Sequence, residues 1–155
     1  MSQRFLETEA DRRLLIRFIE EQPLPLTVSL SKGGKRTLRQ NKLQRLWMGE
    51  IAEQLGDQTP EEVRGYCKLT IGVPILRAVH EGFRERYDAI VRPLPYEHKL
   101  AMMMEPFDFK VTRLMDTKQF TTYLDGVHRY WSSKGIALTD PGDLLADPTT
   151  SHSGR

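Results

Sequence analysis

The chain has 155 residues, of which 39% are hydrophobic and 28% charged, and its formal net charge is only +2. This composition is typical of a globular domain, and no apolar stretch approaches the roughly 20 residues that span a bilayer. Its single cysteine excludes an intrachain disulfide. We therefore expect a cytoplasmic protein with no signal segment, with one domain over residues 1–145 and a disordered tail over residues 146–155.

The first part of the chain predicts a helix and then a strand. Thr8 and Asp11 have the spacing of a helix start. The apolar residues that follow recur at helical spacing and form one face: Leu14, Leu15, Phe18 and Ile19. Residues 24–30 are rich in strand-forming residues and lead into a Gly-Gly pair, which predicts a strand ending in a tight turn.

A second helix is predicted from Thr37 to Leu55. Thr37 and Gln40 have capping-box spacing, and Gly56 follows the last turn. The apolar side of this helix comprises Leu43, Leu46, Trp47, Ile51 and Leu55. The rest of its surface is basic in the first half of the helix.

The second half of the chain predicts more helices and one more strand. Thr59 and Pro60 begin a helix, a break is expected at residues 72–74, and residues 75–91 form the next helix. Apolar and polar residues alternate over 107–112, which predicts a strand.

A last helix is predicted to begin at Thr117 and to end at Gly135. The order of all these elements predicts an α+β fold that is predominantly helical, with a small antiparallel β element.

The distribution of charge is the strongest functional signal in this chain. No acidic residue occurs from Gln22 to Gly49, although that segment contains Lys32, Lys35, Arg36, Arg39, Lys42 and Arg45. Such a basic block is typical of a protein that binds a phosphate-rich partner. The amides of Gln40 and Asn41 lie among these cations and could contact sugars or base edges, which favours nucleic acid. A solvated helix face is the plain alternative.

The remaining reactive or aromatic residues give weaker evidence about function. Trp47 and Trp131 fall in apolar helical registers and are predicted to be core, whereas Tyr96 and Phe107 are better candidates for stacking on bases. Cys67 lies on an apolar helical face and is predicted to be a buried, inert thiol. The histidines have no metal-ligand spacing, so neither a metal nor another cofactor is expected.

One enzymatic alternative stays open. Asp88, Asp108 and Lys110 fit the loose acid…acid-x-Lys arrangement of metal-dependent nucleases. In such a site the carboxylates hold a divalent metal and the lysine orients the attacking water. The motif is short, and Asp88 falls on a predicted helix where those enzymes use a strand or its end.

The block from Leu38 to Trp47 resembles the signature of the NinB family of phage recombination mediators, with Gln40 and Asn41 among the direct matches. The resemblance continues into the helix after Thr59 and returns at residues 113–120. It implies a non-enzymatic protein of the bacterial host cytoplasm that forms an intertwined homodimer and binds single-stranded DNA. It further implies that the protein helps to load a recombinase onto DNA coated by single-strand-binding protein.

The residues predicted to bind DNA are Lys32, Lys35, Arg36, Arg39, Gln40, Asn41, Lys42 and Arg45. A protein-only adaptor remains a further alternative, in which this basic block faces an acidic tail such as that of single-strand-binding protein.

Overall fold

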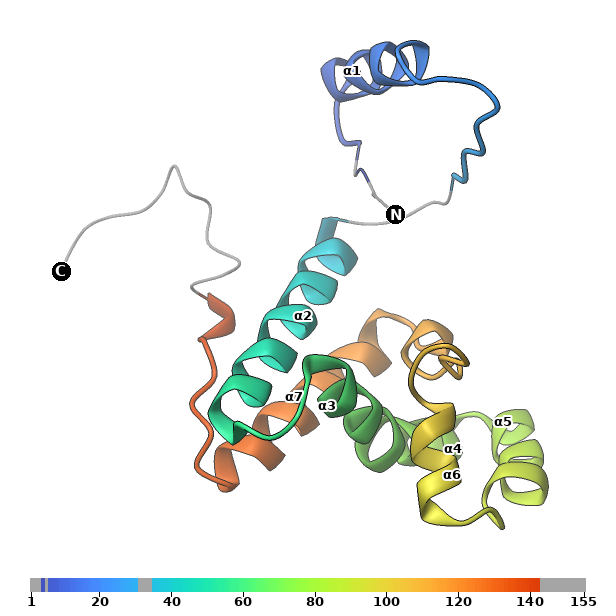
Figure 1. Ribbon diagram of the computed structural model, residues 1–155, viewed down its shortest axis with the longest axis vertical. Coiled ribbons are helices and arrows are strands. Elements are labelled where there is room, and N and C mark those ends of the chain that lie inside the picture. The colour runs from blue at the N-terminus through green and yellow to red at the C-terminus, as the bar shows by residue number, and fades with distance from the viewer. Residues whose placement is uncertain (1–3, 5, 31–34, 143–155) are drawn as a thin grey trace, which may run out of the picture. The chain divides into compact units, whose positions relative to one another are not determined.

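The computed structural model describes residues 4, 6–30 and 35–142, with residues 35–38 as backbone only (Figure 1). Its contacts divide the chain into two compact units, residues 1–41 and residues 42–155, and the division falls within one long helix. The single domain predicted over residues 1–145 stays a prediction. The predicted tail lies outside the described residues, as do Lys32 and the Gly-Gly turn.

The first unit contains helix α1 (Glu9–Glu20) and begins where the sequence predicts. The Thr8 hydroxyl accepts the Asp11 N–H at 3.1 Å, and the Asp11 carboxylate accepts the Thr8 N–H at 3.1 Å. This reciprocal capping box satisfies two backbone donors that the first turn leaves without helical partners. No residue of α1 is buried.

Residues 24–30 form neither helix nor strand, so the predicted strand is wrong. A β-strand is defined by backbone hydrogen bonds to a neighbouring strand. The described part of the chain contains no second strand that could supply them. Extended-forming residues alone therefore do not produce a sheet here.

The strand predicted over residues 107–112 is wrong for a more local reason. Asp108 has a φ of 47°, and this left-handed backbone turns the chain out of an extended path. The Asp108 N–H donates to Met104 O at 2.8 Å, and the Phe109 N–H donates to Met102 O at 3.0 Å. The fold prediction is thus corrected from α+β to a mostly helical architecture, with no strand among the described residues. The intertwined homodimer stays a prediction.

Helix α2 (Lys35–Leu55) runs from the first unit into the second. It ends at Leu55 as predicted, where Gly56 takes a φ of 84°. It begins two residues ahead of Thr37, so the predicted cap at Thr37 is wrong. The elements that follow are α3 (Pro60–Cys67), the π-helical turn η1 (Lys68–Gly72), α4 (Val73–Val79), α5 (Glu81–Arg86), the π-helical turn η2 (Tyr87–Val91), α6 (Tyr96–Met102), the 3₁₀ turn η3 (Thr112–Leu114) and α7 (Thr117–Ser133).

The helix break predicted at residues 72–74 does not occur, because α3, η1 and α4 follow one another without a gap. The Val73 N–H donates to Lys68 O, five residues back, just before Pro74. This wider turn carries the helix past a proline that cannot donate a backbone hydrogen bond. The helix predicted over residues 75–91 instead breaks at His80, whose Nδ1 accepts the Phe83 N–H at 3.2 Å and caps α5.

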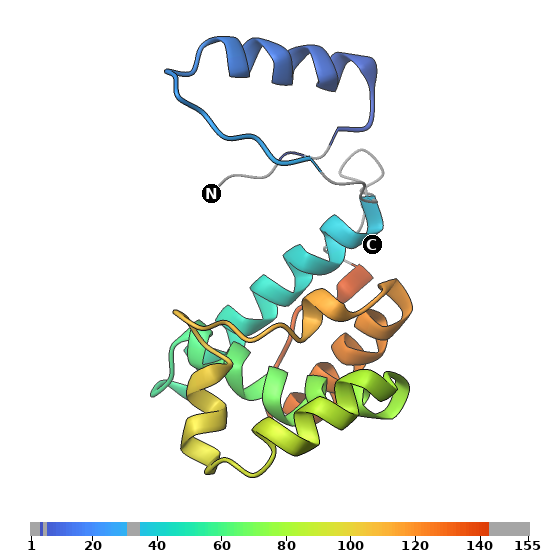
Figure 2. The ribbon, with the colours of Figure 1, turned by 90° about the vertical axis from the view of Figure 1, so that its right-hand side faces the viewer.

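The core of the second unit has two parts, and α2, α3 and α7 enclose the larger one (Figures 1 and 2). It contains Leu43, Trp47, Met48, Ile51, Ala52, Val63, Cys67, Phe120, Tyr123, Leu124, Val127 and Trp131. The smaller part joins α4, η2 and the loop after α6 through Val73, Leu76, Tyr87, Val91, Met103 and Val111. The predictions that Trp47, Trp131 and Cys67 are buried are confirmed. Burial raises the pKa of the Cys67 thiol to about 11, which keeps it protonated and unreactive.

Helix α7 is delimited by recognisable signals at both ends. The Asp116 carboxylate accepts the Gln119 N–H at 2.7 Å at its start, and Gly135 follows its end with a φ of 87°. None of the helices in the described part of the chain combines the length and apolar character that crossing a bilayer requires.

Candidate nucleic-acid interface

The exposed side of α2 carries a short basic stripe, which we define as Asn41, Lys42 and Arg45. All three side chains are exposed, while the neighbouring positions Leu43 and Gln44 are buried. Lys42 and Arg45 are three residues apart, so they lie on one side of the helix within about 6 Å of each other at Cβ. The stripe is thus on the solvent side of α2, because the apolar side of the helix packs in the core.

Neither Lys42 nor Arg45 forms an ion pair within the part of the chain that the structure describes. Most of the other arginines that the structure describes in the second unit behave differently; Arg64, Arg77 and Arg92, for example, each pair with a carboxylate. An exposed cation without a counter-charge is available to a phosphate without the loss of an internal pair. The structure therefore leaves these two side chains open to an anionic ligand.

The other predicted DNA-binding residues are placed less favourably or lie outside the described side chains. Arg39 is half-buried, and Gln40 is only 8% exposed on the inward side of α2. A contact from Gln40 to a base edge would require its amide to turn outward. The backbone of Lys35 and Arg36 lies in the first turn of α2, and their side chains are outside the described atoms.

A segment that the sequence did not single out lies along α2. We call residues 136–142 the strap. Gln54 holds Ala137 by two hydrogen bonds, from its amide to Ala137 O at 2.7 Å and from the Ala137 N–H to its carbonyl at 2.9 Å. Glu50 accepts hydrogen bonds from the N–H and the hydroxyl of Thr139, and the Trp47 indole donates to Thr139 O at 2.9 Å. Polar side chains of α2 thus bind the strap mainly by its backbone.

We expect Gln54→Ala to lower the free energy of unfolding by about 1–2 kcal/mol, because two hydrogen bonds to Ala137 are lost. Urea denaturation measures this change. Glu53→Ala is the matched control, since Glu53 is an exposed neighbour on α2 and its loss should change stability by less than about 0.5 kcal/mol. Equal stability of the two variants would show that the strap contributes nothing measurable.

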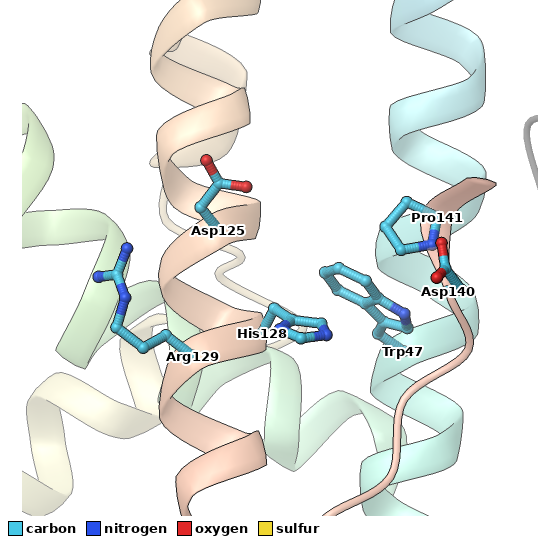
Figure 3. Close-up of a pocket in the computed structure, with 6 residues that line it drawn as sticks. All are labelled: Trp47, Asp125, His128, Arg129, Asp140 and Pro141. Atoms are coloured by element: carbon cyan, nitrogen blue, oxygen red, sulfur yellow. The ribbon is translucent and has the colours of Figure 1, made fainter.

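A pocket of about 550 Å³ opens between α7 and the strap (Figure 3). Its lining comprises Trp47, Asp125, His128, Arg129, Asp140 and Pro141. His128 points toward the indole of Trp47, with ring centroids 5.4 Å apart. The lining contains two carboxylates and one guanidinium, so the pocket does not favour a phosphate as the basic stripe does. Of the predicted DNA-binding residues whose side chains the structure describes, none lines it.

Asp108 lies at the centre of a second polar site, which we call the Asp108 cluster: Glu61, Arg64, Lys68, Asp108 and Arg113. Lys68 Nζ and Arg64 Nη2 each lie 2.8 Å from Asp108 Oδ1, and Arg113 Nη2 lies 3.1 Å from Oδ2. The Lys68 side chain is almost fully buried and also donates to Met103 O at 2.7 Å. Burial alone would raise the pKa of Asp108, but the hydrogen bonds from Lys68 and Arg64 lower it to about 2.

These contacts leave the nuclease alternative without support. Both oxygens of Asp108 are already held by cations, and Asp88 is held by Arg77 at 2.7 and 2.8 Å. A metal ion would have to displace a lysine or an arginine from each carboxylate. Within residues 6–30 and 35–142, no cluster of three or more histidine, cysteine or acidic side chains has the arrangement of a metal site.

No protein-family model, curated protein or solved structure matches this chain. The resemblance to the NinB family thus rests on the sequence blocks that carry it and stays a prediction. Of the residues in those blocks, Asn41 is exposed on the basic stripe, whereas Trp47 is buried and bound to the strap.

Proposed function

We propose that this protein binds single-stranded DNA through the exposed side of α2. The observation that carries this proposal is the basic stripe, in which Lys42 and Arg45 reach solvent without an ion-pair partner among the described residues. The stripe lies in a stretch, Gln22 to Gly49, that has no acidic residue to repel a phosphate backbone. Lys35, Arg36 and Arg39 extend the positive charge toward the start of the helix.

The chemistry of the stripe suits a flexible polyanion. Each cation that neutralises a phosphate releases condensed counterions, and this release drives binding without regard to sequence. Asn41 can donate to and accept from a sugar or a base edge beside these phosphate contacts. We therefore expect affinity that depends strongly on salt and weakly on sequence.

We further propose a role as a recombination mediator, on the resemblance of residues 38–47 to the NinB family. In this role the protein is a homodimer without catalytic activity, and it helps to load a recombinase onto DNA coated by single-strand-binding protein. The resemblance, rather than the geometry of α2, supports the single-strand preference and these partners.

Fluorescence anisotropy of labelled single-stranded and double-stranded oligonucleotides, at low and moderate salt, tests the proposal. Tighter, salt-sensitive binding of the single strand is the expected result. Folded protein that binds neither oligonucleotide would contradict the proposal and favour the adaptor, which a pull-down with the acidic tail of single-strand-binding protein would then examine. Cleavage of the oligonucleotide with Mg²⁺ would instead favour the nuclease.

A further inference from the structure

The loop between α6 and η3 presents one aromatic side chain to solvent. Phe107 is 72% exposed, and among the phenylalanines, tyrosines and tryptophans of the described residues only Tyr96, at 49%, is also classed as exposed. The residues on either side of this loop are core, since Met103 and Val111 are 0% and 1% exposed. The loop is thus fixed in the smaller core at both ends while its aromatic tip is left outside.

The backbone around Phe107 is held from several directions. The Asp108 N–H closes a turn onto Met104 O at 2.8 Å, and the Glu105 N–H donates to the Glu61 carboxylate at 2.9 Å. The Asp108 carboxylate is fixed by the cations of the Asp108 cluster, and Arg113 also donates to Asp108 O at 3.0 Å. Burying a lysine and holding an aspartate in the left-handed region both cost folding free energy. Here the buried Lys68 binds the carboxylate of the left-handed Asp108, the residue that directly follows Phe107.

The charge around the loop is positive by one, because the exposed carboxylate of Glu105 offsets Lys110 and leaves the net charge of the Asp108 cluster. In the Asp108 cluster three cations face two carboxylates, so the cluster keeps one net positive charge. Arg113, whose side chain is 59% exposed, lies on the solvent side of this cluster. Lys110 is exposed three residues after Phe107. An exposed ring beside exposed cations is the combination that binds single-stranded nucleic acid, by base stacking and phosphate contact together.

We propose that Phe107 is a stacking platform for a base of single-stranded DNA, positioned by the Asp108 cluster. This inference rests on the proposed function, since it requires that the protein binds DNA. Because the loop is already fixed, stacking does not first have to order the backbone that carries the ring, and this pre-organisation favours affinity. Every base has an aromatic face, so the contact adds affinity without adding sequence preference.

Phe107→Ala tests the platform, with Ile90→Ala as the matched control because Ile90 is also exposed, at 67%, and lies elsewhere in the same unit. Loss of one base stack should weaken binding of a single-stranded oligonucleotide about tenfold. A stack releases no counterions, so the salt dependence should keep the slope of the wild type. Phe107→Trp should retain affinity, and its fluorescence should be quenched when DNA is added.

An oligonucleotide with abasic sites provides the second arm of this experiment. The wild type and Phe107→Ala should bind it with equal affinity, because there is no base to stack. If Phe107→Ala does not fold by circular dichroism, Phe107→Leu replaces it, since leucine keeps apolar bulk but has no ring; the same tenfold loss is expected.

Each other outcome overturns the inference in a distinguishable way. Wild-type affinity of Phe107→Ala for normal single strands would remove the platform and leave the proposed function intact. An equal loss on abasic and normal strands would show that the ring does not stack on bases. A change in oligomeric state by light scattering, with unchanged DNA affinity, would assign Phe107 to a contact between copies. A wild type that binds no DNA would remove both proposals.

Discussion

Replacing Lys42 and Arg45 together by alanine is expected to weaken binding of single-stranded DNA by roughly ten- to a hundredfold at moderate salt. Both side chains are exposed on one side of α2 and have no ion-pair partner in the described part of the chain. Their loss therefore costs two phosphate contacts and no internal pair. The slope of log K against log salt should become shallower by about 1.4, at about 0.7 for each single-strand contact.

The matched control is the double variant Arg86→Ala, Lys118→Ala. These cations are also exposed in the second unit and free of ion pairs within the described residues, and their removal changes the net charge by the same amount. If Lys42 and Arg45 contact the DNA directly, this control should keep the affinity and the salt slope of the wild type. If both double variants lose affinity equally, net charge rather than the basic stripe governs binding. If Lys42→Ala, Arg45→Ala has unchanged affinity and an unchanged salt slope, the basic stripe does not contact the DNA.

Asp108→Ala should be the most destabilising substitution proposed for this protein. It leaves the ammonium of Lys68, a residue with 1% of its surface exposed, with Met103 O as its remaining acceptor. Breaking a buried pair by removing one partner costs about 3–5 kcal/mol, which corresponds to a fall in Tm of about 6–20 °C for a chain of this length. Thermal and urea unfolding both measure it.

A double-mutant cycle separates the buried charge from the other contacts of Asp108. Lys68→Met should cost only about 1 kcal/mol, because Asp108 keeps Arg64 and Arg113 and the methionine fills the same space. The double variant Lys68→Met, Asp108→Ala should be more stable than Asp108→Ala alone, since no unpaired ammonium remains buried. If Asp108→Ala is as stable as Lys68→Met, the cluster does not stabilise the loop as we infer.

The Asp108 carboxylate is also expected to make the free energy of unfolding depend on pH in the acid range. Burial opposes ionisation of Asp108, but the hydrogen bonds from Lys68 and Arg64 prevail and hold its pKa at about 2. An aspartate in the unfolded chain has a pKa of about 3.9, so the unfolded state takes up the proton first as the pH falls. The contribution of Asp108 is therefore complete above about pH 4 and is lost as the pH falls toward 2. Asp108→Ala should show a weaker decline in the free energy of unfolding over this window, measured by urea titration.

The helix boundaries show which structural features can be predicted from neighbouring residues alone. Thr8, Thr59 and Gly56 act at short range, through a cap or a left-handed residue, so the sequence alone predicted the ends that they set. The break expected before Pro74 and the continuity expected at His80 were wrong. A backbone hydrogen bond from Val73 to Lys68, five residues back, carries the helix past residues 72–74, and the His80 side chain caps a new helix at residue 81. Neither interaction follows from the helix propensity of the residues.

Sequence by itself determined most of the apolar side of α2, where Leu43, Trp47 and Ile51 are buried but the predicted Leu46 is exposed. It also determined the acid-free stretch that makes the start of α2 basic, because helical spacing and charge are properties of consecutive residues. Only the tertiary structure decided that residues 24–30 and 107–112 are not strands, since a strand needs a partner and Asp108 is drawn into a turn by Arg64 and Lys68. It also decided which cations stay free: Lys68 is buried against a carboxylate forty residues away, whereas Lys42 faces solvent. Pairing and exposure depend on what lies opposite a side chain in space, and that information is not local to any segment of the chain.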